Sequence, residues 1–131
     1  MRYLLDTNVV IALLNDATSA VARTARRHRP GNIGISAVIA HELFYGAYKS
    51  HRAKQNVALV ESLRLEVLDF DKDDARKAGE IRALLAVMGS PIGPYDVLIA
   101  GQALARDMIL VTHNTNEFSR VPGLRIEDWE A

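Results

Sequence analysis

Cysteine is absent from this sequence of 131 residues, which excludes a disulfide framework, a cysteine-ligated zinc site and thiol catalysis. Net charge is absent as well, because sixteen Lys and Arg residues balance sixteen Asp and Glu residues. The chain as a whole is therefore not a polycation built to coat nucleic acid, and any anion-binding site must be local. The lack of cysteine gives no sign of an oxidising compartment, so a reducing cytoplasm is the simplest expectation.

Long apolar runs are also missing. None approaches the roughly 20 residues of a membrane-spanning helix, and the amino terminus lacks the pattern of a signal peptide. We therefore expect a cytoplasmic protein that does not contact membranes. The apolar residues, 49% of the chain, occur instead in short runs that suit one core. With no repeat and no long linker, a single domain over residues 1–131 is predicted.

Short apolar runs alternate with segments of helical spacing along the chain. The patterns predict strands at 2–5, 32–36, 66–70, 108–112 and 124–129, and helices at 8–16, 19–29, 37–50, 53–65, 71–89, 95–107 and 114–118. This alternation predicts an α/β domain with a central parallel sheet of four to five strands and helices on both faces. Such sheets place their sites beyond the carboxyl ends of the strands, where Asp6 and the segment "THNTNEF" fall.

Three acidic residues occupy positions that an apolar core disfavours. Asp6 interrupts the apolar run "YLLDTNVVIALL", and Asp96, which follows Pro94, has Ile99 and Ala100 one turn away. Glu42 shares a helical face with Val38, Ile39, Tyr45 and Gly46, so its carboxylate is expected to point inward. Clustered carboxylates repel one another unless a cation compensates them, and oxygen ligands suit Mg²⁺ or Mn²⁺.

Capping roles remain open for several of these residues. Asp6 can cap the helix that begins at Thr7 or Asn8, and Asp96 can interact with a helix dipole. Asn114, followed three residues later by Glu117, has the pattern of a capping box. Capping and metal ligation are compatible roles.

The other polar residues give weaker indications of a functional site. The four histidines, His28, His41, His51 and His113, show no metal-ligand spacing on one helix face, which argues against zinc. Ser36 lacks the sequence context of an activated nucleophile, and "PIGP" is too short for a phosphate-binding loop. The basic run "RTARRHR" is either a solvated helix face or a phosphate-binding patch built from Arg23, Arg26 and Arg27.

Four pieces of the sequence match a known pattern in the right order. They are "LLDTNVVIALL", "ISAVIAHELFYGAYKS", "GSPIGPYDVLIAGQALARDMILVTHNTNEFSRVPGL" and "IEDW". On these pieces, which cover most of the chain, it resembles a PIN-domain ribonuclease of the VapC toxin group, from toxin–antitoxin modules. The resemblance implies that the metal-site acids are Asp6, Glu42 and Asp96, with the fourth position on Asn114 and a further acid at Glu117.

Two positions depart from the family pattern. Many members carry Asp where this chain has Asn114, which removes one negative charge from the expected site. His113 stands where Asn or Arg is expected beside it. Thr112, by contrast, matches the small hydroxyl residue that the family places next to the metal site.

The resemblance implies a metal-dependent endoribonuclease that acts as a toxin. Asp6, Glu42, Asp96 and Asn114 would be catalytic and would hold one or two Mg²⁺ or Mn²⁺ ions, with Glu117 able to position a second ion. The hydrogen-bonding residues expected beside these ligands are Thr7, Asn8 and Thr112. Activated water would cut cellular RNA, with a transfer RNA loop as one candidate, and leave 5′-phosphate and 3′-hydroxyl ends.

The resemblance also implies partners. A VapB-like antitoxin is expected to silence the acidic pocket, often with a basic side chain, and the toxin is expected to be a homodimer, either alone or within a larger toxin–antitoxin assembly. Apolar side chains on the early helices, such as Val10, Leu13 and Leu14, are expected to be partly committed to these interfaces.

Three alternatives compete with this interpretation. A receiver-type phosphoacceptor domain needs an acidic pair after the first strand and a lysine after the last, but Asp6 is followed by Thr7 and no lysine follows Lys77. A haloacid-type phosphatase needs a second Asp where Asn8 stands. A PIN-like module that binds RNA or protein without cutting remains open, because only activity with added metal distinguishes it.

Overall fold

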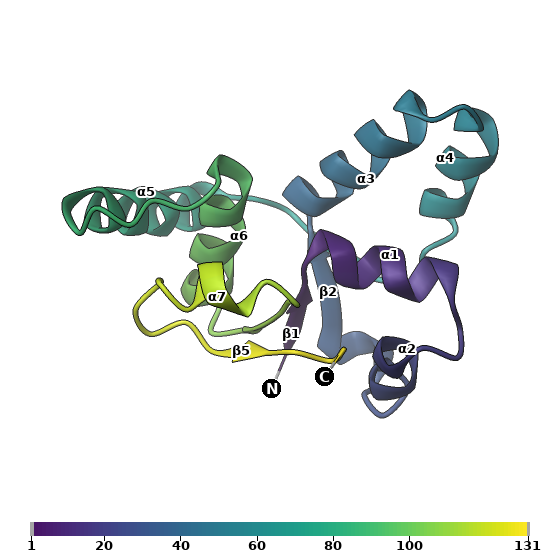
Figure 1. Cartoon of the computed structure of the whole chain (residues 1–131), viewed down its shortest axis with the longest axis horizontal. Coiled ribbons are helices and arrows are strands. Elements are labelled where there is room, and N and C mark those ends of the chain that lie inside the picture. The colour runs from purple at the N-terminus through teal and green to yellow at the C-terminus, as the bar shows by residue number, and fades with distance from the viewer. Residues whose placement is uncertain (1, 131) are drawn as a thin grey trace.

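The computed structural model describes residues 2–130, and this range forms one sheet of five strands with seven α-helices (Figure 1). The strands are β1 (Tyr3–Leu5), β2 (Ile33–Ser36), β3 (Glu66–Leu68), β4 (Ile109–Val111) and β5 (Ile126–Glu127). The helices are α1 (Thr7–Asn15), α2 (Ala20–Ala25), α3 (Ala37–Lys49), α4 (Ala53–Glu61), α5 (Lys72–Val87), α6 (Pro94–Ala105) and α7 (Thr115–Phe118). In this range no helix combines the length and the apolarity that crossing a membrane requires.

The sheet is parallel throughout, in the order β3-β2-β1-β4-β5, which confirms the predicted α/β class. Its central strands are buried on both sides, and the side chains of Leu4, Leu5, Leu110 and Val111 are fully buried. Short runs of consecutive apolar residues form such strands because helices cover both faces of a parallel sheet.

The helices form two layers (Figure 1). Helices α1 to α4 lie on one side of the sheet and α5 to α7 on the other. The chain leaves β1 toward β2 through one layer and leaves β4 toward β5 through the other. Strands β1 and β4 are neighbours, so a crevice forms between their carboxyl ends, where α/β sheets commonly bind ligands.

Several predicted elements are too long. The helix expected at 19–29 ends at Ala25, and the chain then turns into the 3₁₀ segment Pro30–Asn32. The cause is Pro30, which disfavours helical geometry in the residue before it, and Arg29 is extended with φ −67° and ψ 138°. The helix expected at 53–65 ends at Glu61, and the last strand is confined to Ile126–Glu127.

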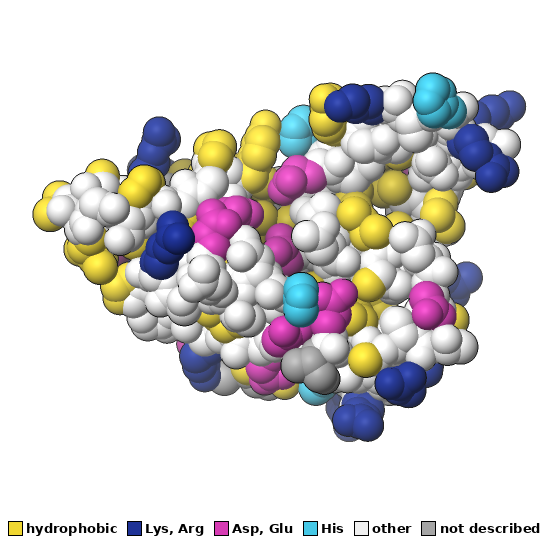
Figure 2. Space-filling view, in the orientation of Figure 1, with side chains coloured by type: hydrophobic (Ala, Val, Ile, Leu, Met, Phe, Trp, Pro, Cys, Tyr) yellow, Lys and Arg dark blue, Asp and Glu magenta, His cyan; other side chains and the backbone are white. Residues whose placement is uncertain are grey.

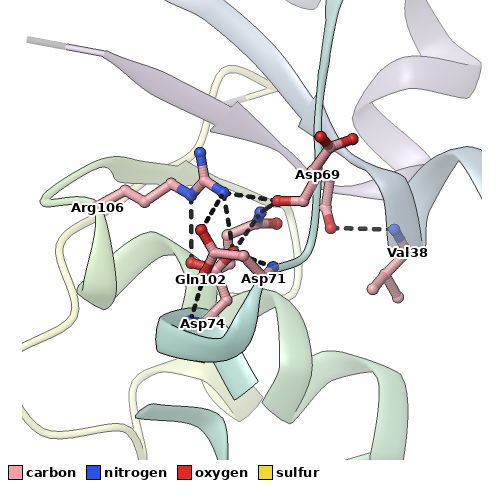
Figure 3. Close-up of polar contacts among 7 residues, drawn as sticks. Val38, Asp69, Asp71, Asp74, Gln102 and Arg106 are labelled. Carbon is pink, nitrogen blue, oxygen red and sulfur yellow. Dashed lines mark hydrogen bonds and ion pairs between the residues drawn. The ribbon is translucent and has the colours of Figure 1, made fainter. Parts of the chain in front are cut away.

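A buried ion pair joins α5 to α6 (Figure 3). Asp74, which is 1% exposed, accepts hydrogen bonds from Arg106 Nη2 at 2.9 Å and from Gln102 Nε2 at 3.2 Å. Gly101, which directly precedes Gln102 on α6, permits the close approach of α5, since a Cβ at this position would lie 2.5 Å from Ala78 Cα. No sequence pattern predicted this pair, which ties α5 to the carboxyl-terminal end of the helix that carries Asp96.

Candidate active site

Asp6 and Thr112 meet at the crevice between β1 and β4. Asp6 is 8% exposed, and its Oδ2 accepts a hydrogen bond of 2.8 Å from the hydroxyl of the fully buried Thr112. Its Oδ1 accepts the backbone N–H of Thr7 at 2.8 Å, so Asp6 is itself the N-cap of α1. The capping interpretation of Asp6 is therefore correct, and it coexists with a position at the carboxyl edge of the sheet. Thr7 and Asn8 do not cap the helix.

Glu42 extends from the middle of α3 toward Asp6. Burial raises the pKa of its half-buried carboxyl, and the negative charge of Asp6 raises this pKa further. The predicted apolar face around Glu42 is only half right, because Ile39 is fully buried whereas Tyr45 is 61% exposed. Gly46 is exposed too, since this part of α3 extends away from the sheet (Figure 1).

Asp96 lies in the first turn of α6, and its inward orientation is confirmed by the full burial of Ile99 and Ala100 one turn later. Burial raises the pKa of Asp96 to about 7, and the charges of Glu117 and Asp6 add to the effect. A helix N-terminus alone would favour the ionised carboxylate. Asp96 does lie in the first turn of α6, as the dipole interpretation expects, but desolvation and neighbouring acids raise its pKa.

Glu117 is held in place by two donors. Its Oε1 accepts the backbone N–H of Gly93 at 2.8 Å, and its Oε2 accepts Asn114 Nδ2 at 2.7 Å. Both bonds lower the pKa of Glu117, and the bond from Gly93 has the larger effect. Gly93 also leaves room for Asp96, because a Cβ at this position would lie 3.0 Å from Asp96 Oδ2.

The expected capping box between Asn114 and Glu117 does not form. Asn114 precedes α7, but its side chain makes no capping hydrogen bond and instead donates to the side chain of Glu117. The backbone N–H of Asn114 donates to Thr112 Oγ1 at 3.0 Å, which fixes the loop between β4 and α7. Asn114 is thus connected to both Asp6, through Thr112, and Asp96, through Glu117.

His113 lies beside this loop and contacts the carboxyl-terminal segment. Its Nδ1 is 3.1 Å from both Asp128 Oδ2 and Glu130 Oε2. Across residues 2–130, these three side chains form the one set of three whose ligand atoms lie within 4.8 Å of one another. The carboxylates of Asp6, Glu42 and Asp96 are less tightly gathered, as expected for like charges without a cation between them.

The remaining predicted residues lie outside the acidic cluster. Asn8 is exposed on α1 and, within residues 2–130, forms no side-chain hydrogen bond to the acids. Arg23 and Arg26 donate to the backbone oxygens of Thr18 and Ala17, at 2.6 and 2.8 Å. They stabilise the turn between α1 and α2, which lies away from the carboxyl ends of the strands (Figure 1). RNA contact by Arg23, Arg26 and Arg27 stays a prediction.

An apolar groove of about 310 Å³ opens beside the acids, between α1, α3 and α4. Its lining includes Thr7 and Glu42 at the site and the apolar side chains of Ile11, Leu14, Leu43, Leu59 and Val60. The expectation that Val10 is available to an interface is wrong, because Val10 is fully buried in the core. The exposed apolar residue on α1 is Ile11, which is 40% exposed.

The donor set fits a hard divalent cation. Asp6, Glu42, Asp96 and Glu117 offer only oxygen ligands, and the charges that act on Glu42 and Asp96 include no Lys or Arg. Thr7 Oγ1, buried at the edge of the cluster, lies near enough to Glu42 to lower the pKa of that carboxyl, but it has no partner at hydrogen-bonding distance among the described residues. A cation with its water ligands would compensate the carboxylates and could supply this missing partner.

Comparison with known proteins identifies the family of this chain. The PIN domain model matches residues 3–124, a range that contains every acid of the cluster. The chain belongs to the PIN-domain family. This PIN domain is 44% identical to the tRNA(fMet)-specific endonuclease VapC of Shigella flexneri over 131 residues, 98% of each chain. It is 36% identical to Ribonuclease VapC2 of Haemophilus influenzae, with 98% of each chain covered.

Solved structures place the PIN domain in the VapC group that the resemblance indicated. DNA-bound VapBC from Salmonella typhimurium contains a chain with a TM-score of 0.92 and 44% identity, and the match covers 98% of each chain. VapBC2 from Rickettsia felis, bound to a promoter DNA fragment, matches with a TM-score of 0.91 and 35% identity, over 98% and 99% of the two chains.

Proposed function

We propose that this PIN domain is a Mg²⁺- or Mn²⁺-dependent endoribonuclease and the toxin of a toxin–antitoxin module. The observation that carries the proposal is the group of four carboxylates, Asp6, Glu42, Asp96 and Glu117, at the carboxyl edge of the sheet. Among the described residues none of the four forms an ion pair, although the charges of Arg120 and His41 act on Glu117 and Glu42 from further away. The names of the VapC relatives support a nuclease.

Asp6, Glu42 and Asp96 would hold one ion through carboxylate oxygens, and Asn114 and Glu117 lie where they could hold or orient a second. A bound Mg²⁺ or Mn²⁺ supplies a Lewis acid for the scissile phosphate and lowers the pKa of water. The Thr112 hydroxyl fixes Asp6 Oδ2, and the Gly93 N–H fixes Glu117 Oε1. The chain's own contribution is therefore to position carboxylates before an ion arrives.

The pair Asp96 and Glu117 can carry a proton. Burial and neighbouring charges raise the pKa of Asp96 to about 7, whereas the backbone N–H of Gly93 lowers the pKa of Glu117, so without a bound ion a proton shared by this pair resides on Asp96. Attack of water on phosphorus breaks the bond to the 3′ oxygen, which leaves with a proton as a 3′-hydroxyl. The phosphate stays on the 5′ end of the next nucleotide. Asp96 would lose its proton when an ion binds, because only the ionised carboxylate of Asp96 is a metal ligand, so the leaving 3′ oxygen takes its proton from water.

The substrate we propose is a structured cellular RNA cut in an accessible loop. A relative at 44% identity over nearly the whole chain is named for tRNA(fMet), so initiator transfer RNA is the first substrate to test.

We propose a VapB-like antitoxin as the partner, within a homodimeric or larger toxin–antitoxin assembly. Support comes from the solved neighbours, which are VapBC complexes, and from the apolar groove that opens onto Glu42. An antitoxin helix could place apolar side chains against Ile11 and Leu59 and a basic side chain beside the acids. Such a cation would compensate the same charges that a metal ion compensates.

The test is to incubate purified protein with total RNA and with initiator transfer RNA, in Mn²⁺ or in EDTA, and to map the cut ends. Ribonuclease activity predicts cuts only with Mn²⁺, with 5′-phosphate and 3′-hydroxyl ends. Cuts that persist in EDTA, or ends with a 2′,3′-cyclic phosphate, would contradict the proposed chemistry. RNA binding without cleavage under all metal conditions would favour the non-catalytic alternative.

A further inference from the structure

Three of the four tyrosines have exposed rings, and all three lie on α3 and α6, the helices that carry Glu42 and Asp96. Tyr45, Tyr48 and Tyr95 are 61%, 68% and 47% exposed. The fourth, Tyr3, packs against Trp129 with ring centroids 5.4 Å apart. Exposed aromatic rings that gather next to a site, rather than scatter over the surface, indicate an interaction surface.

Their positions tie them to the ligand-bearing helices. Tyr45 and Tyr48 follow Glu42 on α3 by one and two turns, and Tyr95 directly precedes Asp96 on α6. The ring of His41 lies 5.9 Å from that of Tyr95, which bridges the two helices across the mouth of the site. In Figure 2, hydrophobic and His side chains border the acidic side chains on the edge formed by α3 and α6.

This aromatic rim also carries positive charge. Lys49 Nζ lies 5.6 Å from the ring centroid of Tyr45, within the range of a cation–π contact. Within residues 2–130, Lys49 forms no ion pair with an acid. The turn from α3 to α4 and the first turn of α4 add three more basic residues, His51, Arg52 and Lys54. Flat rings interleaved with basic groups match the two parts of an RNA strand, bases and phosphates.

We propose that His41, Tyr45, Tyr48 and Tyr95 form a stacking surface for unpaired bases of the RNA substrate, with Lys49 contacting the adjacent phosphate. The inference rests on the proposed ribonuclease activity and names the part of the substrate that the site selects. Bases in a duplex are already stacked on one another, whereas loop bases are free to stack on aromatic side chains. The surface therefore favours cleavage in single-stranded loops.

RNA explains this surface better than a protein partner does. The apolar groove suited to an antitoxin helix is lined by aliphatic side chains of α1, α3 and α4, and neither Tyr45 nor Tyr48 lines it. Along this part of α3, the exposed neighbours of Tyr45 and Tyr48 are Gly46 and Lys49. No aliphatic side chain there is as exposed as the two rings. The two surfaces diverge from Glu42, which leaves separate paths for RNA and for antitoxin.

The test measures RNA binding separately from cleavage. Fluorescence anisotropy in EDTA gives Kd for a fluorescein-labelled single-stranded RNA and for a duplex of the same sequence. Tyr45→Ala, Tyr48→Ala and Tyr95→Ala are each expected to weaken single-strand binding about fivefold or more, as for the loss of one stacked base. The matching Phe variants should bind like wild type, because they keep the ring. Lys49→Ala should reduce the salt dependence of binding by about one phosphate contact.

Two further variants control for fold and for general charge. Tyr45→Leu keeps apolar area but lacks a flat ring. Stacking therefore predicts weaker RNA binding by this variant, whereas apolar docking predicts no change in RNA binding. Arg64→Ala removes an exposed cation next to the amino end of β3, at the opposite edge of the sheet, and should leave Kd unchanged. All variants should keep the wild-type thermal midpoint, because the altered side chains are exposed.

The outcomes separate this inference from the proposed function. If wild type cuts RNA with Mn²⁺ while the Ala variants bind and cut like wild type, the stacking surface is wrong and the ribonuclease stands. If the Ala variants instead lose self-association or antitoxin binding at unchanged RNA affinity, the rim is a protein interface and the inference is overturned. If wild type cuts no RNA under any metal condition, the proposed function fails at its own test.

Discussion

The hydroxyl of Thr112 donates a 2.8 Å hydrogen bond to Asp6 Oδ2 and accepts the backbone N–H of Asn114 at 3.0 Å. One buried hydroxyl thus connects the end of β1, the end of β4 and the loop that leads to Glu117. It satisfies one oxygen of Asp6 while the N–H of Thr7 satisfies the other. The acid is therefore oriented before any ion binds, which reduces the reorganisation that binding requires.

Thr112→Val removes this donor while nearly preserving volume. We expect a loss of about 1–3 kcal/mol in the free energy of unfolding, because Asp6 is left buried without one of its partners. Cleavage should also fall, since Asp6 loses its orientation. Urea unfolding and Mn²⁺-dependent cleavage measure the two effects, and Thr112→Ser, which keeps the hydroxyl, should restore both. Equal activity of the Val and Ser variants would remove Thr112 from the account of the site.

Asp96 predicts a dependence of stability on pH. Its pKa is about 7 in the folded protein and 3.8 for the unperturbed group, so between these values the folded state binds more protons than the unfolded state. Stability in EDTA should therefore fall as pH rises through this window, and Asp96→Asn should remove that part of the fall. At about pH 8 the variant should melt roughly 2–6 °C above wild type. Thermal melts at several pH values measure the difference.

Mn²⁺ should reverse the order of thermal stability of wild type and Asp96→Asn. Mn²⁺ should raise the wild-type melting temperature at pH values above the pKa of Asp96, because the ion binds the folded state and compensates its carboxylates. The Asp96→Asn variant should gain much less. A wild type less stable than the variant both with and without Mn²⁺ would mean that the cluster does not bind the ion.

Asn114→Asp tests the position where the chain departs from many family members. In the structure Asn114 Nδ2 donates to Glu117 Oε2 at 2.7 Å, so the variant replaces a hydrogen bond with two facing carboxylates. We expect lower stability in EDTA and a larger stabilisation by Mn²⁺ than in wild type. The Mn²⁺ concentration for half-maximal cleavage should also shift. Asn114→Ser, which adds no charge, is the matched control, and identical metal responses of the two variants would assign Asn114 a structural role only.

The ion pair of Asp74 and Arg106 predicts a purely structural effect. Arg106→Met leaves the carboxylate of Asp74 buried without its charged partner and should cost about 2–4 kcal/mol of stability. The exposed pair Lys77–Glu80 is the control, and Lys77→Met should change stability by less than about 1 kcal/mol. Cleavage per folded molecule should be unchanged in both. Reduced cleavage in Arg106→Met at full folding would mean that α6 shifts and displaces Asp96.

The sequence predicted the elements whose pattern is local. Strand β1, helix α6 and the inward positions of Asp6 and Asp96 follow from runs of apolar residues and their helical spacing. The carboxyl edge of a parallel sheet then brings Asp6 near the loop after β4 without any further information. The family resemblance supplied the rest of the expected ligand set.

Contacts between distant segments could not be predicted in this way. The N–H of Gly93 binds Glu117, 24 residues away, and no periodicity encodes a backbone donor. The pair Asp74 and Arg106 is separated by 32 residues, and each side chain alone has the pattern of an ordinary exposed charge. Asn114 illustrates the opposite error, because its local capping pattern does not form: the side chain of Glu117 instead accepts the distant backbone N–H of Gly93 and the side-chain N–H of Asn114.

Calorimetric titration of Mn²⁺ into wild type and Asp96→Asn, with initiator transfer RNA cleavage measured on the same samples, tests the central claim most directly. We predict that wild type binds Mn²⁺ and cuts the RNA only when the ion is bound. The Asp96→Asn variant, folded and at least as stable in EDTA, should bind Mn²⁺ at least tenfold more weakly, about 1.4 kcal/mol, and should not cut. Equal Mn²⁺ affinity and equal cleavage in the two proteins would contradict the assignment of the acidic cluster as the metal site of a ribonuclease.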